Sequence, residues 1–189
     1  MPEDEAWPTP VPAPAPAPAE DSVDAGFARD MAVHHQQAVE LSFIVRDRTD
    51  DADVRRLAYD IINTQANQRG MLLGRLDAWD LPTISEEPPM AWMDHAMSHE
   101  PHDGSLMPGM ATNTELDRLR RAEGEAAEVR YLQLMTAHHQ GGVHMAEAAA
   151  NQAEDPTIAR LAEGMVSGQQ SEIDLMADML TERGAEPLP

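Results

Sequence analysis

An internal repeat constrains the fold of this chain more than any other feature of its sequence. The motif His-His-Gln occurs twice at an offset of 104 residues, as His34-His35-Gln36 and as His138-His139-Gln140. The same offset, without a gap, pairs Phe27 with Tyr131, Met31 with Met135, Val39 with Val143, Arg56-Leu57-Ala58 with Arg160-Leu161-Ala162, Gln65 with Gln169, and Leu76 with Leu180. A common helical pattern explains apolar matches, but not a matching histidine pair. We therefore infer a duplication.

Each copy has the pattern of two helices joined by a turn. Apolar residues recur every three to four positions rather than every second one, which indicates helices and no strands. Asp155-Pro156 places an N-cap acid before a first-turn proline, and Thr112 with Glu115 forms a capping box. These signals predict helices over 24–47, 52–79, 125–152 and 156–183, with a short one over 113–122.

The repeat predicts an all-α, ferritin-like four-helix bundle. One helical hairpin cannot hide its apolar stripe from water, whereas two hairpins packed together can, and a long crossover between them is typical of ferritin-like bundles. We expect a Pro/Ala-rich linker over 1–23 and a single domain over 24–184. Within that domain the hairpin repeats span 24–82 and 125–184, and a crossover rich in methionine and histidine spans 83–124.

Composition excludes several classes of function. The 189 residues carry a formal net charge of −21, which argues against nucleic-acid binding because phosphate contacts need a basic face. Without cysteine there is no disulfide and no thiolate site, and no apolar run is long enough to span a membrane. The acidic start is not a signal peptide. No nucleophile–base set and no phosphate-binding loop stands out, so we expect a protein that is not an enzyme.

Histidine and methionine share a helix face in both copies. Residues three, four and seven positions apart lie on one face, which groups Met135, His138, Gly142 and Met145, with His139 beside them. The first copy repeats this row as Met31, His34, Ala38 and Leu41, with His35 beside them. The last helix adds a stripe of Met165, Gln169, Glu172, Met176 and Met179, for which the second helix has a weaker equivalent in Gln65, Gln68 and Leu72.

Imidazole nitrogen and thioether sulfur together favour copper, especially Cu(I), over calcium or magnesium. Zinc would accept the histidines and Glu172 but has little use for methionine. Gly141 and Gly142, inside a helix, indicate close backbone approach, which we expect to be to a facing helix. Core packing by the methionines, hydrogen bonding by the histidines and glutamines, and a solvated Glu172 are the competing interpretations. The crossover offers a second candidate region with Met90, Met93, Met97, Met107, Met110, His95, His99 and His102.

Four motifs resemble the domain of unknown function 305 family over about residues 24–184. They are Met31-x-x-His34-His35-Gln36, Met107-Pro108-Gly109-Met110, Met135-x-x-His138-His139-Gln140-Gly141 and Gln169-x-x-Glu172-Ile173-x-x-Met176. The resemblance implies a ferritin-like bundle that is exported or anchored outside the cytoplasm, with some periplasmic copper-binding relatives. Carried over residue by residue, it implies a ligand set of His34, His35, Met135, His138, His139, Met145, Glu172 and Met176.

Three functions follow from these observations. The first is a non-enzymatic copper protein outside the cytoplasm that buffers, carries or detoxifies the metal. The second is a structural or interaction module, alone or as a homo-oligomer, whose histidines only stitch the bundle together. The third is a di-metal oxidase, which the absence of any Glu-x-x-His motif disfavours. Neighbouring helical residues diverge by about 100°, so the pattern does not say which histidine of each pair points inward.

Overall fold

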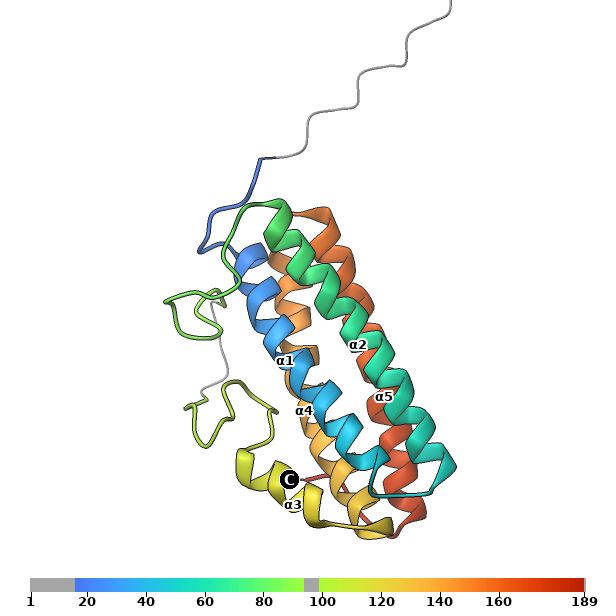
Figure 1. The fold of residues 1–189 in the computed structure, drawn as a ribbon. Coiled ribbons are helices and arrows are strands. Elements are labelled where there is room, and N and C mark those ends of the chain that lie inside the picture. The colour runs from blue at the N-terminus through green and yellow to red at the C-terminus, as the bar shows by residue number, and fades with distance from the viewer. Residues whose placement is uncertain (1–15, 94–98, 189) are drawn as a thin grey trace, which may run out of the picture.

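The computed structural model describes residues 16–93 and 99–188, and those residues contain five helices and no strand. The first hairpin consists of α1 (Val23–Arg46) and α2 (Ala52–Ala78), and the second of α4 (Gly124–Gln152) and α5 (Pro156–Glu182) (Figure 1). A short helix, α3 (Asn113–Arg121), lies in the crossover. The all-α prediction is confirmed, and each predicted helix boundary lies within one residue of the observed one. His95 and Met97 of the predicted crossover set lie outside the described residues.

The helices begin where the sequence carries capping residues. The carboxylates of Asp51 and Asp155 each accept two backbone amides in the first turns of α2 and α5, and these two caps are repeat equivalents. Thr112 and Glu115 form the predicted capping box of α3, and the Ser22 hydroxyl caps α1. Each cap supplies acceptors to amides that have no partner within the helix. The two hairpins are therefore defined by local signals that were duplicated with them.

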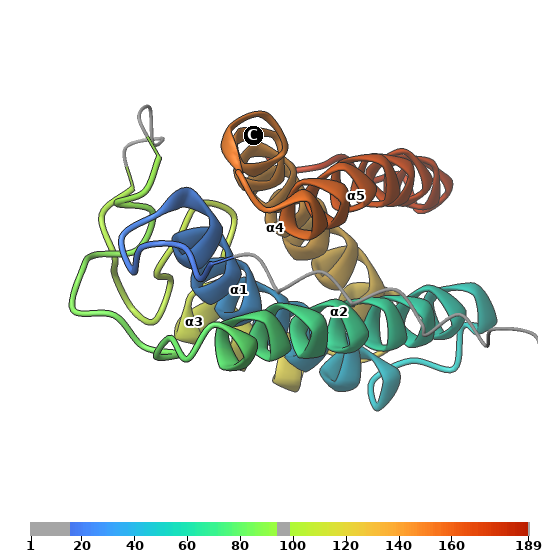
Figure 2. The same cartoon turned by 90° about the horizontal axis from the view of Figure 1, so that it is seen from above.

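Helices α1 and α4 run antiparallel through the centre, and each carries its hairpin partner on one side (Figures 1 and 2). The core forms two apolar clusters. The upper cluster of Figure 1 includes Phe27, Met31, Leu72, Leu76, Met145, Ile158 and Met165. The lower cluster includes Leu41, Val54, Ile61, Tyr131, Met135, Met176, Met179 and Leu180. Because α1 and α4 are antiparallel, repeat-equivalent residues such as Met31 and Met135 lie in different clusters, Met31 in the upper one and Met135 in the lower one.

A polar layer separates the two apolar clusters at the middle of the bundle. It consists of buried histidines and glutamines contributed by all four long helices: His34, His35, Gln65, His138, His139 and Gln169. This level is where the approximate two-fold symmetry of the duplication brings repeat-equivalent residues face to face. The duplication therefore builds its polar residues into one central layer rather than into two separate ends.

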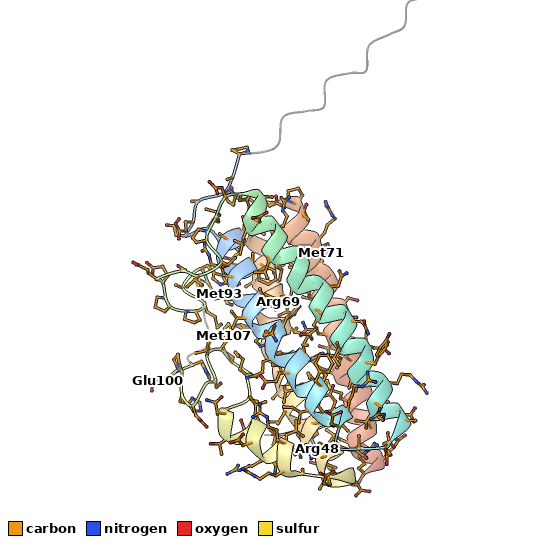
Figure 3. All side chains as sticks on the ribbon, viewed as in Figure 1. Arg48, Arg69, Met71, Met93, Glu100 and Met107 are labelled. Carbon is orange, nitrogen blue, oxygen red and sulfur yellow. The ribbon has the colours of Figure 1, made fainter. Side chains whose placement is uncertain are left out.

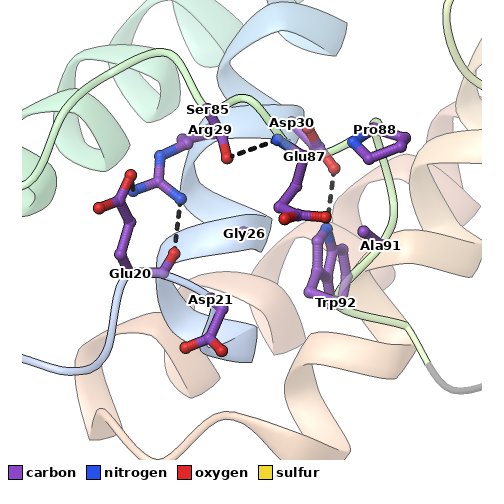
Figure 4. A pocket seen from close by; sticks show the side chains of 10 residues that line it. All are labelled: Glu20, Asp21, Gly26, Arg29, Asp30, Ser85, Glu87, Pro88, Ala91 and Trp92. Atoms are coloured by element: carbon purple, nitrogen blue, oxygen red, sulfur yellow. Dashed lines mark hydrogen bonds and ion pairs between the residues drawn. The ribbon is translucent and has the colours of Figure 1, made fainter.

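The crossover descends along one side of α1 from the upper to the lower end of the bundle (Figure 1). Arg29 of α1 donates to the Pro82 carbonyl over 2.8 Å, and the Asp30 carboxylate accepts the Met90 amide and the Trp92 indole N–H over 2.6 and 2.8 Å. Figure 4 shows the hydrogen bond between Asp30 and Trp92 among the residues that line a surface pocket. Burial raises the pKa of Asp30, although its hydrogen bonds partly oppose this effect. The upper crossover is thus tied to α1.

The methionines of the crossover serve mainly as core. Met90, Met93 and Met107 are buried in the upper cluster, and Met110 packs against it. In Figure 3 Met93 and Met107 lie on the side of the crossover nearer to α1, whereas Glu100 lies at its outer edge. No helix in the described part of the chain combines the length and apolar character that crossing a membrane requires.

Candidate metal centre

The structure brings both histidine pairs into the polar layer, and all four side chains are fully buried. The His34 and His138 rings stack across the α1–α4 interface, with centroids 3.7 Å apart and planes tilted by 32°. His138 Nε2 donates to the His34 carbonyl over 3.0 Å. Since adjacent helical residues diverge by about 100°, His35 and His139 instead point to their hairpin partners. Both members of each pair therefore face inward, towards different helices.

The outer histidines have equivalent partners of different charge. His35 Nε2 lies 2.9 Å from Gln68 Oε1 on α2, and His139 Nε2 lies 2.7 Å from Glu172 Oε2 on α5. Oxygen acceptors at these distances require Nε2 to carry the proton, which leaves the lone pair on Nδ1. Histidines that bind metals generally donate their second N–H in this way, which fixes the tautomer and orients the ring.

Several polar atoms of the layer have no hydrogen-bond partner within residues 16–93 and 99–188. They are both ring nitrogens of His34, Nδ1 of His35, His138 and His139, and both amide atoms of Gln65 and of Gln169. Hydrogen bonding was the competing interpretation for Gln65 and Gln169, and in this part of the structure their amides form no hydrogen bonds. Buried polar groups are nearly always paired, and exceptions call for an explanation such as a bound ion or water. The layer therefore contains imidazole nitrogens that make no hydrogen bond and whose lone pairs are available to a metal ion.

Burial keeps the imidazoles of His34, His35 and His138 neutral. It lowers the pKa of His34 to about 3, an effect to which the neighbouring His35 adds and which the nearby Pro108 carbonyl partly opposes. Burial also lowers the pKa of His35 to about 3. It lowers the pKa of His138 well below its ordinary value, and the neighbouring His34 lowers it further. A metal must displace a proton from a protonated ligand. At neutral pH these three rings present their lone pairs without that competition.

The predicted methionine ligands border the layer. Met135 and Met176 are buried in the lower cluster and Met145 in the upper one, and Met135 lies one helical turn before His138. Glu172 is about one quarter exposed and holds His139. Within the described ranges no three histidine, aspartate or glutamate side chains gather closely enough to hold a metal. The donors present therefore suit a soft ion held by nitrogen and sulfur better than a carboxylate-bound pair of ions.

Glycines let the crossover and α5 approach this layer. A Cβ on Gly141 would collide with the Pro108 carbonyl, and one on Gly109, whose φ is +79°, would collide with the Ala137 carbonyl. A Cβ on Gly142 would collide with the Gln169 amide. Both helix glycines do lie against a close neighbour, but at Gly142 it is the side chain of Gln169 on α5 rather than a backbone. At Gly141, however, the neighbour is the crossover rather than a facing helix.

Sequence reasoning missed how the crossover reaches the site. Gln37 of α1 exchanges two hydrogen bonds with the Ala111 backbone, of 2.6 and 2.9 Å, and Pro108 lies over α4 beside His138. Gly141 was the sequence signal for the contact between Pro108 and α4. No motif predicted the hydrogen bonds between Gln37 and Ala111. The other crossover candidates, His99 and His102, do not belong to the polar layer: His99 is partly buried and His102 exposed on the outer loop.

The sequence profile of DUF305, a domain of unknown function, matches residues 24–180. The chain belongs to the DUF305 family. A DUF305 protein of Streptomyces coelicolor, described as secreted, is 59% identical and has a TM-score of 0.82, with 90% of this chain and 99% of that one covered. A DUF305 fragment from Deinococcus radiodurans is 31% identical, with a TM-score of 0.70 and coverage of 89% and 99%.

A more distant structural likeness is to CopM in its Cu(I)-bound form. The TM-score is 0.64 and the identity 20%, over 84% of this chain and 96% of that one. At this identity the likeness shows the shared helical fold alone. No protein of curated function matches the chain.

Proposed function

We propose that this DUF305 protein binds copper as Cu(I) in its buried polar layer, acts outside the cytoplasm, and is not an enzyme. The observation that carries the proposal is the set of unpartnered, fully buried imidazole nitrogens of His34, His35, His138 and His139. Leaving such groups unpaired costs roughly 1–3 kcal/mol each. A cation that binds the lone pairs of these imidazole nitrogens would offset the free-energy cost of leaving those nitrogens without a hydrogen bond.

The donor chemistry selects the ion. Neutral imidazole with thioether sulfur suits Cu(I), whereas calcium and magnesium need oxygen ligands that the layer does not provide. The candidate ligands are the four histidines with Met135, Met145 and Met176, and an ion would be held by a subset of them, because no three histidine or carboxylate side chains of the described residues gather closely enough to bind one metal. We assign Glu172 to the orientation of His139, because its carboxylate accepts the Nε2 proton. The protein would only bind the ion, in a buried layer where the lowered pKa values of His34, His35 and His138 leave these rings neutral at pH 7.

The comparisons support the same choice. CopM, whose fold this chain shares, is described in Cu(I)-bound, Cu(II)-bound and silver-bound forms. Silver is a soft monovalent ion like Cu(I), so the bound forms of CopM fit soft-donor chemistry. The Streptomyces coelicolor relative, which is described as secreted, supports the proposed location outside the cytoplasm. Buffering, delivery or detoxification of copper are the roles open to such a protein.

A competition titration against a Cu(I) chelator tests the proposal. We expect the wild-type chain to take up Cu(I), and His138→Ala/His139→Ala to lose that uptake. Because the double variant removes buried packing, His35→Gln/His139→Gln serves as a second variant that keeps a hydrogen-bonding side chain at each position. The matched control is His144→Gln, a histidine of α4 that is outside the layer.

A structural module is the second candidate function. The observation in its favour is that His138 bonds to α1 and His139 to α5, so that histidines link three of the long helices. In that case the histidine variants would lower the melting temperature, while added Cu(I) would leave the wild-type melting temperature unchanged. A ligand that binds the native state must raise it. No uptake of Cu(I) together with no thermal shift would overturn the copper proposal.

A further inference from the structure

Two histidines of the crossover lie together on the surface, away from the polar layer. The His99 and His102 rings have centroids 5.7 Å apart and planes tilted by 41°. Neither side chain takes part in the proposed Cu(I) site. Both belong to the short loop that leads into the segment covering α4. A pair of imidazoles at this separation is compatible with both rings binding one ion.

Backbone hydrogen bonds hold this loop in one shape. His102 N–H donates to the Ser105 carbonyl over 3.1 Å, and Ser105 N–H donates back to the His102 carbonyl over 2.8 Å. The turn between them has positive φ at Asp103 and Gly104, of 44° and 83°. The Asp103 carbonyl accepts the amide of Asn113 over 2.7 Å, which anchors the turn to the start of α3. His102 therefore stands on a constrained turn, and the His99 ring contacts the same turn at the Ser105 carbonyl.

Hydrogen bonds also fix which nitrogen of each ring carries the proton. His99 Nε2 lies 3.2 Å from the Ser105 carbonyl, and His102 Nδ1 lies 2.9 Å from the Glu100 carbonyl. A carbonyl can only accept, so these nitrogens donate and the lone pairs reside on His99 Nδ1 and His102 Nε2. This arrangement, with one nitrogen bound to a backbone carbonyl and the other open, is typical of metal-binding histidines.

We infer that His99 and His102 form a second metal site, which takes a divalent cation of the Cu²⁺ type from solution. Imidazole with water as the remaining ligand suits Cu²⁺, which binds most strongly among the divalent first-row ions. The net charge of −21 raises the local concentration of cations at the surface. The site does not depend on the proposed Cu(I) centre: it uses different residues, is open to solvent and has no sulfur ligand in its pair.

A titration of the full chain with Cu²⁺ alone tests this inference. We expect binding of one ion that the double variant His99→Gln/His102→Gln weakens about tenfold or more, and that His144→Gln leaves unchanged. In NMR spectra, substoichiometric Cu²⁺ should first broaden the ring signals of His99 and His102. Circular dichroism of the double variant should remain that of the wild type, because both side chains lie outside the core.

The inference is overturned if the double variant binds Cu²⁺ as tightly as the wild type. It is also overturned if broadening appears first at His144 or at surface carboxylates. The chelator competition for Cu(I) separates the two sites: the double variant should keep the wild-type Cu(I) affinity. A negative result at the His99–His102 pair therefore does not contradict the proposed Cu(I) site, and a negative result in the Cu(I) competition does not contradict the surface site.

Discussion

The two halves of the molecule share a fold but differ in the chemistry around their outer histidines. In the second half His139 donates to the carboxylate of Glu172, whereas in the first half His35 donates to the neutral amide of Gln68. Four residues further along, α5 has Met176 where α2 has Leu72. A carboxylate partner raises the basicity of an imidazole ligand more than an amide does. The duplication therefore kept the imidazoles in both halves but placed the stronger donor set in one.

The halves also differ in how they hold the crossover. Position 37 of the first half and position 141 of the second are repeat equivalents, and both contact the crossover. Gln37 reaches it through two hydrogen bonds to Ala111, whereas Gly141 allows the Pro108 carbonyl to lie directly against α4. One half uses a long polar side chain, and the other uses the absence of a side chain. The two contacts together fix the segment that covers His138.

Removing the close approach in the second half should have the largest effect. In Gly141→Ala the new Cβ meets the Pro108 carbonyl, which is backbone and cannot rotate away. We expect the free energy of unfolding to fall by about 3 kcal/mol, the upper end of the usual cost of overpacking. Urea denaturation monitored by circular dichroism measures it.

The matched control is Gly164→Ala on α5, where a Cβ would meet no atom within 4 Å in the described structure. It should stabilise the protein by about 0.5–1 kcal/mol, because alanine loses less backbone entropy in a helix. If both variants changed stability alike, the crossover would not be held at Gly141.

Local signals made the helices predictable. The caps at Asp51, Thr112 and Asp155 act within a few residues of the helix ends that they determine, so the sequence alone is enough to place those ends. The placement of both histidines of a pair required more. His34 and His35 are buried against different helices, α4 and α2, and that depends on how the two hairpins dock.

The path of the crossover was the least predictable feature. Its contacts with α1 and α4 use the backbone of Pro108 and Ala111, and every sequence has such backbone groups. The glycine at position 141 indicated that something approaches α4, but a missing side chain does not identify its neighbour. The sequence pattern makes the crossover methionines candidate ligands, whereas in the structure Met107 is buried in the upper apolar cluster.

Exchanging the donor sets tests the difference between the halves directly. Glu172→Gln/Met176→Leu gives the second half the pattern of the first, and we expect its Cu(I) affinity to fall about 100-fold, roughly 2.7 kcal/mol. The reciprocal Gln68→Glu/Leu72→Met should strengthen Cu(I) binding or add a second ion. Chelator competition measures both. An unchanged affinity in the first variant would show that copper binding does not depend on the asymmetry.

Loss of the polar contact in the first half should cost somewhat less than the glycine substitution. Gln37→Ala leaves the buried N–H and C=O of Ala111 without their partners, and we expect the free energy of unfolding to fall by about 2 kcal/mol. The exposed neighbour Gln36→Ala should change it by less than about 0.5 kcal/mol. Hydrogen exchange at the Ala111 amide should also accelerate in the first variant. Unaltered exchange there would mean that the crossover is held by other contacts.

Measured per pH unit, the smallest effect is that of the charge on His35 itself. Its pKa is lowered from 6.5 to about 3 in the fold, so between these values the unfolded chain binds a proton that the native chain does not. The free energy of unfolding is therefore undiminished by His35 above about pH 6.5. Between pH 6.5 and about 3 it falls by about 1.4 kcal/mol per pH unit because of this group. His35→Gln should make the pH profile of unfolding between pH 6 and 4 shallower by that amount. Leu72→Ala, which destabilises the same hairpin without titrating, should lower the whole profile without changing its slope. Equal slopes in wild type and His35→Gln would mean that the His35 ring is protonated in the native bundle.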